Sequence, residues 1–196
     1  SDLVIYHRSH EQAKQEGTGR MAALRATKEQ AEKICQEHEN LYIAAVNAPA
    51  AITLAGNKDV IATVVEKNPG KAKQLRVTCA FHTPEMDPIK EPFSKAMEGV
   101  VKSNPGKRDI PYYSTVTGEY YDGSFGTDYW WSNIRGAVLF QPAIEAILQE
   151  TKPDVFLEIA ASNTLLSSVK QIAHGLDPKH PPVTVNSSLR DKDDLQ

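Results

Sequence analysis

The succession of apolar and helical segments in the first half of this chain constrains its fold more than any other feature. A short apolar run at residues 21–24 predicts a strand, and Thr27-Lys28-Glu29-Gln30 has the form of a capping box that begins a helix. Two further apolar runs follow at residues 41–46 and 51–54, and each predicts a strand. The order predicted to this point is therefore strand, helix, strand, strand.

A second helix and a last strand complete this part of the chain. Gly56-Asn57-Lys58-Asp59 opens a helix that runs through Val65, and residues 72–77 predict another strand. The full order, strand-helix-strand-strand-helix-strand, is that of the split βαβ arrangement, in which two helices back four antiparallel strands. We therefore predict a small ferredoxin-like subdomain at residues 20–78.

The remainder of the chain alternates helices with strands, which predicts an α/β body around the inserted module. Helices are expected at residues 2–15, 84–97, 127–135, 141–149 and 165–174, and strands at 110–114, 155–159 and 183–187, the last two side by side. We assign residues 1–19 and 79–190 to this large subdomain and residues 191–196 to the start of a linker. Because the chain begins without Met inside a helical pattern, we expect it to be part of a longer protein.

The composition excludes several classes of protein. With 196 residues, 40% of them hydrophobic and 24% charged, the chain has the usage of a globular domain with a packed core. Its formal net charge is -3 and its basic residues are scattered among acids, so we expect no nucleic-acid partner. It has 2 cysteines, no signal sequence and no apolar run of spanning length, which indicates a cytoplasmic protein that does not enter a membrane.

The first candidate for chemistry is Cys79-Ala80-Phe81-His82-Thr83-Pro84, where a strand is predicted to lead into a helix. Strand ends are where α/β folds place functional groups, and a histidine can act as a general base near neutral pH. Spacing alone favours a plainer interpretation of His82 as a helix-capping or partly buried structural histidine.

Two Cys-x-x-His pairs, Cys35 with His38 and Cys79 with His82, would together supply four zinc ligands. The first pair lies on a predicted helix and the second at a strand end, and neither is flanked by the tight turns of a zinc knuckle. Two isolated cysteines are the simpler interpretation, and we expect no metal.

Arg8 is the remaining candidate, on the first predicted helix beside the apolar Leu3 and Ile5. Its planar fork can bind a carboxylate through two hydrogen bonds, although a lone helical arginine is more often a solvated surface group. The chain has no Gly-x-Ser-x-Gly elbow, because Gly123-Ser124-Phe125-Gly126 lacks the required spacing. If His82 is a base, its nucleophile lies outside this chain.

Strings along the whole chain resemble the acyltransferase domains of type I polyketide and fatty-acid synthases. They are Ala45-Val46-Asn47-Ala48-Pro49, Leu54-Ala55-Gly56, Ala80-Phe81-His82-Thr83-Pro84-Glu85-Met86, Pro111-Tyr112-Tyr113-Ser114-Thr115-Val116-Thr117-Gly118, Asp128-Tyr129-Trp130-Trp131-Ser132-Asn133-Ile134-Arg135, Val155-Phe156-Leu157-Glu158-Ile159 and Ser188-Leu189-Arg190. The family's small ferredoxin-like subdomain coincides with residues 20–78. The resemblance implies that the large subdomain is part of an α/β-hydrolase-like acyltransferase core.

In that family a serine on a Gly-x-Ser-x-Gly elbow is acylated by an acyl-CoA and passes the group to the phosphopantetheine thiol of an acyl carrier protein. The resemblance implies that His82 activates this serine, with its ring oriented by the backbone carbonyl of Asn133. It implies that Arg8 binds the free carboxylate of a malonyl-type group. Phe81 matches the malonyl-preferring form of the motif, since a bulky ring there would crowd an α-methyl group.

The chain departs from the family pattern in several places. The family's serine elbow and its glutamine-bearing oxyanion loop lie before Ser1, so we expect no acylation of this chain alone. Cys79 stands where the family commonly has histidine, and residues 160–165 lack the usual His-Pro.

The resemblance also implies partners: malonyl-CoA, an acyl carrier protein and neighbouring synthase domains such as a ketosynthase, with no bound cofactor. Two alternatives stay open at this point. The chain could be a ferredoxin-like ligand-binding module that uses only residues 20–78, or a non-catalytic synthase segment.

Overall fold

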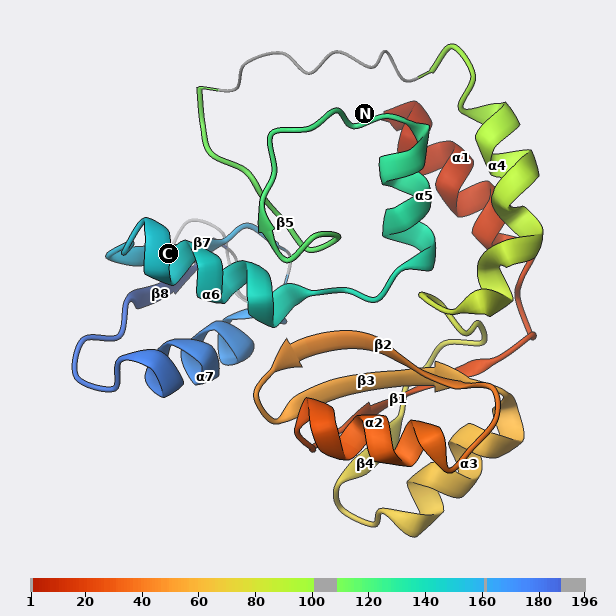
Figure 1. Ribbon diagram of the computed structural model, residues 1–196, viewed down its shortest axis with the longest axis horizontal. Coiled ribbons are helices and arrows are strands. Elements are labelled where there is room, and N and C mark those ends of the chain that lie inside the picture. The colour runs from red at the N-terminus through yellow and green to blue at the C-terminus, as the bar shows by residue number, and fades with distance from the viewer. Residues whose placement is uncertain (1, 101–108, 161, 188–196) are drawn as a thin grey trace.

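The computed structural model describes residues 2–100, 109–160 and 162–187 (Figure 1). Along the chain the elements are α1 (Asp2–Ala13), β1 (Arg20–Leu24), α2 (Lys28–Gln36), β2 (Leu41–Ala48), β3 (Ala51–Gly56), α3 (Lys58–Lys67), β4 (Ala72–Gln74), η1 (Pro84–Ile89), α4 (Lys90–Ala96), β5 (Tyr113–Ser114), β6 (Glu119–Tyr120), α5 (Thr127–Arg135), α6 (Phe140–Glu150), β7 (Val155–Glu158), α7 (Leu166–Leu176) and β8 (Val183–Asn186). Helices and strands are interspersed along the chain, as predicted for an α/β protein.

The first four strands form one antiparallel sheet in the order β2-β3-β1-β4, which lies with α2 and α3 at the bottom of Figure 1. The predicted succession of elements over residues 20–78 is present, and Thr27 caps α2 through the predicted capping box. The last strand is shorter than the predicted 72–77. It ends at Gln74, although the N–H of Leu75 still donates to the carbonyl of Met21 over 2.8 Å, and Leu75 and Val77 pack against the cluster that contains Met21.

One face of this sheet packs against the two helices. Side chains that alternate along β1 and β3, among them Ala22, Leu24 and Leu54, are buried with Ala31 of α2 and Ile61 of α3. All members of this core lie between Ala22 and Ala72, so it is built from the elements β1 to β4, α2 and α3 alone.

The opposite face of the sheet packs against the segment that follows β4. Met21, Ala44 and Ala55 are buried together with Ala80, and Phe81 packs against them. Three of these residues are alanines, which lets the backbone of the segment lie close to the sheet. The sheet therefore supports the point at which the chain re-enters the large subdomain.

The chain enters the four-stranded sheet after α1 and leaves it after β4, and the two crossings lie together. The N–H groups of Gly17 and Gly19 both donate to the carbonyl of Thr78, over 2.8 and 3.5 Å. Position 19 has no room for a side chain, because a Cβ there would lie 2.6 Å from the Cβ of Ala80 and 2.8 Å from the carbonyl oxygen of Gly56.

The outer edge of β2 is bound to the segment between α5 and α6. The N–H of Val46 donates to the carbonyl of Val138, and the N–H of Val138 donates to the carbonyl of Ala44, both over 2.8 Å. Further along the strand, Ala48 is buried beside Ile144 of α6 and residues of α7. The edge strand of the small sheet is thus covered by the segment between α5 and α6.

The helix predicted over residues 84–97 is two elements, the 3₁₀ helix η1 and the α-helix α4. Pro88 lies inside η1 and has no N–H to donate, so it cannot continue an α-helical ladder through this turn. Together with α1 and α5 these elements bury Phe93 and Ile134 in a helical layer.

The strands β7 and β8 are adjacent, as predicted, and they pair in parallel with Val155 opposite Val183. The predicted strand at 110–114 shortens to β5, which pairs with an unpredicted strand, β6. Several apolar side chains of the parallel pair face outward: Val155, Leu157 and Val183 are 52, 56 and 61% exposed.

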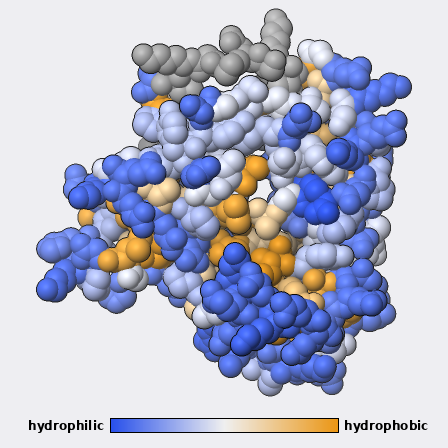
Figure 2. Space-filling model, in the orientation of Figure 1, coloured by the Kyte–Doolittle hydropathy of each residue, from blue (hydrophilic) through white to orange (hydrophobic). Residues whose placement is uncertain are grey.

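The surface differs between the two parts of the molecule. In Figure 2, hydrophilic residues cover the small subdomain around α2 and α3, and hydrophobic residues gather between that subdomain and the elements above it. Within the described residues, the structure contains no helix with the length and apolar character needed to cross a membrane.

We predict that Gly19→Ala destabilises the protein by about 1–3 kcal/mol, because the added methyl group has no space against Ala80 and Gly56. The matched control is Gly175→Ala in α7, where a Cβ meets no atom within 4 Å and alanine is the better helix former by about 1 kcal/mol. Urea unfolding of both variants measures the two effects. Equal stability of the two variants would contradict the close approach at position 19.

Candidate active site

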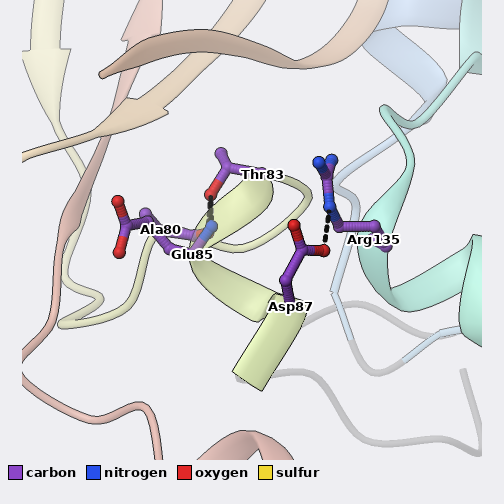
Figure 3. A network of polar contacts seen from close by, with 5 residues as sticks. All are labelled: Ala80, Thr83, Glu85, Asp87 and Arg135. Carbon is purple, nitrogen blue, oxygen red and sulfur yellow. Dashed lines mark hydrogen bonds and ion pairs between the residues drawn. The ribbon is translucent and has the colours of Figure 1, made fainter. Parts of the chain in front are cut away.

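His82 lies in a tight turn between β4 and η1, and its backbone is left-handed, with φ of 62°. A residue other than glycine in this region costs about 1–3 kcal/mol, and such residues gather at functional sites. The side chain of Thr83 closes the turn. Its buried Oγ1 donates to the carbonyl of Ala80 over 2.7 Å. The same oxygen accepts from the N–H of Glu85 over 3.2 Å (Figure 3).

The imidazole of His82 is held by a backbone carbonyl. Its Nδ1 lies 2.9 Å from the carbonyl oxygen of Gly136, the residue that follows α5. A carbonyl only accepts, so a neutral ring carries its proton on Nδ1 and has a free lone pair on Nε2. Burial lowers the pKa of His82, the bond to Gly136 raises it, and the positive charge of Arg8 lowers it further. His82 is therefore arranged as a neutral base.

The carbonyl that contacts His82 is that of Gly136, and the prediction of the Asn133 carbonyl is wrong. Asn133 lies within the last turn of α5, where the carbonyls point along the helix axis. Gly136 follows the helix in an extended conformation, which turns its carbonyl aside. A Cβ on Gly136 would lie 2.8 Å from the carbonyl oxygen of Ser132, so glycine is required there.

An ion pair joins η1 to the end of α5. The Nε of Arg135 donates to Oδ1 of Asp87 over 2.6 Å (Figure 3). Both side chains are partly exposed, so the pair contributes less than about 1 kcal/mol to stability. It connects the element after His82 to the residue before Gly136.

Arg8 lies on α1 and reaches the same region. Its Nε donates to Oε1 of Gln12 over 3.1 Å, and its Nη1 donates to Oδ1 of Asn133 over 2.5 Å. The guanidinium is partly buried, which lowers its pKa, but arginine stays charged at any physiological pH. No carboxylate among the described residues forms an ion pair with it.

Three of the four predicted site residues, Arg8, His82 and Asn133, are linked by an effect of charge and by a hydrogen bond. Arg8 and His82 interact, since the charge of Arg8 acts on the imidazole. Asn133 contacts Arg8 through its side chain. Phe81 packs between the small sheet and the helical layer, directly before His82.

The structure adds three residues that the sequence analysis did not select: Gln12, Thr83 and Gly136. Gln12 stands four residues after Arg8 on one helix, a spacing that places the side chains side by side and could have identified it. Gly136 directly follows a predicted helix, where a glycine is a common signal. No sequence signal shows that its carbonyl faces a histidine.

The two cysteines lie in different surroundings. Cys35 packs against the core of the small subdomain, where burial raises its pKa to about 11. Cys79 is buried near the crossing between subdomains, and its Sγ contacts the carbonyl of Gln15 at 3.2 Å. In the part of the chain that the structure describes, no group of three or more His, Cys, Asp or Glu could hold a metal ion.

Comparison with known proteins shows a family match over the whole chain. The family model described as "Acyl transferase domain" matches residues 1–196. The chain therefore belongs to the acyltransferase domain family.

Curated relatives include hybrid PKS-NRPS synthetases and polyketide synthases. The chain is 39% identical over 148 residues to the hybrid PKS-NRPS synthetase phm1 of Pyrenochaetopsis sp., covering 69% of this chain and 4% of that protein. It is 32% identical over 187 residues to the hybrid PKS-NRPS synthetase fsa1 of Fusarium sp. (strain FN080326), covering 91% of this chain and 5% of that protein. The chain thus spans about a twentieth of the length of these relatives.

Solved structures share the fold. The acyltransferase domain from module 8 of the salinomycin polyketide synthase is 25% identical with a TM-score of 0.86, over 97% of this chain and 45% of that chain. The malonyl CoA-acyl carrier protein transacylase from Clostridium perfringens has a TM-score of 0.80 at 24% identity, over 98% of this chain and 60% of that chain.

The surroundings of His82 predict its titration. We expect its pKa to lie below the ordinary value of 6.5 and to rise in Arg8→Gln, because that variant removes a positive charge that lowers it. NMR of ¹³C-labelled histidine in the acyltransferase domain measures both values. Arg25→Gln, which removes a charge from an exposed position, should leave the pKa of His82 unchanged. A fall or no change in Arg8→Gln would contradict the coupling.

Proposed function

We propose that this chain forms part of an acyltransferase domain that moves a malonyl-type group from coenzyme A to the phosphopantetheine thiol of an acyl carrier protein. The observation that carries the proposal is the pairing of a neutral, oriented histidine with a partly buried arginine that has no acidic partner among the described residues. A base and a free cation side by side suit a reaction in which an anionic acyl group is transferred to and from a nucleophile.

In the first half-reaction His82 Nε2 takes the proton from a serine hydroxyl as the serine oxygen bonds to the thioester carbon. When the tetrahedral intermediate collapses, the carbon–sulfur bond breaks and the proton passes from Nε2 to the sulfur of coenzyme A. In the second half-reaction Nε2 takes the proton of the carrier thiol as the thiol sulfur bonds to the ester carbon. When this second tetrahedral intermediate collapses, the bond between that carbon and the serine oxygen breaks, and Nε2 returns the proton to the serine oxygen. The bond from Gly136 holds the ring in one orientation through all four proton transfers.

The serine would come from a part of the protein outside these residues. No serine hydroxyl in the described ranges hydrogen-bonds to His82, and Ser124 lies in the loop before α5, where its carbonyl accepts from Tyr121. The oxyanion donors would come from the same outside segment.

Arg8 would select the acyl group. A carboxylate that enters a partly closed site must be paired, and the guanidinium offers two parallel N–H groups for that purpose. Phe81 would form part of the wall near the α-carbon and favour malonyl over branched groups, which its position directly before His82 supports.

We also propose that residues 20–78 are a ferredoxin-like small subdomain and that residues 1–19 and 79–190 belong to an α/β-hydrolase-like large subdomain. The antiparallel order β2-β3-β1-β4 and the two helices on one face support the first assignment. The carrier protein, a neighbouring ketosynthase and a cytoplasmic location follow from the synthase relatives and the isolated cysteines, and no bound cofactor takes part in the steps above.

Substitution in the complete acyltransferase domain tests the roles. We expect His82→Asn, which keeps a residue that tolerates left-handed backbone, to lower the rate of self-acylation by about 10²–10⁴-fold. Arg8→Gln should lower acylation by malonyl-CoA about 10- to 100-fold, because it loses charged hydrogen bonds, and should spare acetyl-CoA. Intact-mass measurement after brief exposure to each thioester reads both rates.

The exposed Arg25→Gln serves as the control and should behave as wild type. Equal loss of malonyl and acetyl transfer in Arg8→Gln would rule out carboxylate selection by Arg8. Full acylation of His82→Asn would rule out the histidine as base.

A further inference from the structure

The side chain of Asn133, which contacts Arg8 from α5, is neutral, so it does not cancel the charge of the guanidinium. A guanidinium has five N–H donors. Two of the five are used within the described residues, one by Gln12 of α1 and one by Asn133 of α5. Both acceptors are amide oxygens, so they orient the guanidinium without neutralising it.

The same helix provides a contrast. Arg135, two residues after Asn133 on α5, is paired with the carboxylate of Asp87, which cancels its charge. An aspartate at position 133 would have the shape of asparagine and would reach the same Nη1, but it would cancel the charge of Arg8. The asparagine therefore keeps a positioned but unpaired cation in a partly buried place.

Asn133 also connects the cation to the base. Gly136, whose carbonyl holds His82, follows Asn133 by three residues, a rise of about 4.5 Å along the axis if the helix continued. The neighbouring Ile134 is fully buried, which fixes the rotation of this end of α5. One helix end thus sets the position of Arg8 through a side chain and of His82 through a backbone carbonyl.

We propose that Asn133, assisted by Gln12, is a positioning residue that determines the preference of the site for anionic acyl groups, because it orients Arg8 while leaving its charge uncompensated. The proposal rests on the proposed function, which assigns carboxylate binding to Arg8, and adds the residue that keeps Arg8 available.

The test compares Asn133→Asp with wild type in the complete acyltransferase domain, using malonyl-CoA and acetyl-CoA in competition and intact mass as the readout. We expect the ratio of malonyl to acetyl adduct to fall at least about 10-fold, since a charged hydrogen bond to the substrate is lost. Acetyl acylation should be retained, which a merely structural defect would not allow. The matched control is Ser9→Asp, which adds the same charge beside Arg8 at an exposed position and should keep the wild-type ratio.

Asn133→Ser provides a second variant that removes the contact without adding charge. It should lower the malonyl ratio less than Asn133→Asp does. An unchanged ratio in Asn133→Asp, or an equal loss of both adducts in folded protein, would overturn the proposal.

A binding measurement separates this proposal from the proposed function. Titration with malonate ion, followed through the ¹³C-labelled ring of His82, needs no acylation. Shifts that saturate in wild type and Ser9→Asp but not in Asn133→Asp would support the role of Asn133 even if wild type forms no acyl adduct. Saturation at the same malonate concentration in wild type, Ser9→Asp and Asn133→Asp would overturn the role proposed for Asn133.

Discussion

The buried hydrogen bond from Thr83 to the carbonyl of Ala80 is the constraint on which the site depends. It closes a turn that holds His82 in left-handed backbone and so directs the imidazole toward the carbonyl of Gly136. The strain of that backbone is offset by its surroundings, because Ala80 is buried under the small sheet and Thr83 begins η1. The packing of Ala80 against the small sheet thus helps to orient the imidazole of His82.

Arg8 and His82 depend on each other through charge. Burial is the main cause that lowers the pKa of His82, and the charge of Arg8, which no acid among the described residues pairs, lowers it further. A carboxylate bound to Arg8 would cancel part of that effect and raise the pKa of His82. Under the proposed function, the histidine therefore becomes a stronger base when the malonyl group is in place, and a group without a carboxylate does not produce this change.

The sequence predicted the features that depend on neighbouring residues and missed those that depend on how elements meet. The Thr27 capping box and the helix Thr127–Arg135 follow from local patterns, and both are present. The division of the helix expected over residues 84–97 also has a local cause, the proline at position 88. The sequence motif placed Asn133 at the site, but whether its side chain or its carbonyl faces inward depends on where α5 ends relative to His82. That relation is set by tertiary packing.

The attachment of the small sheet at two places limits how the protein can move. One attachment is at the beginning of β1, where the crossings share the Thr78 carbonyl, and the other is along the outer edge of β2, at Val138. A sheet attached at one point could rotate about that point. A sheet attached through two different strands cannot rotate without breaking one set of hydrogen bonds. The small sheet therefore shifts relative to the elements around it only when one of these two sets of hydrogen bonds breaks.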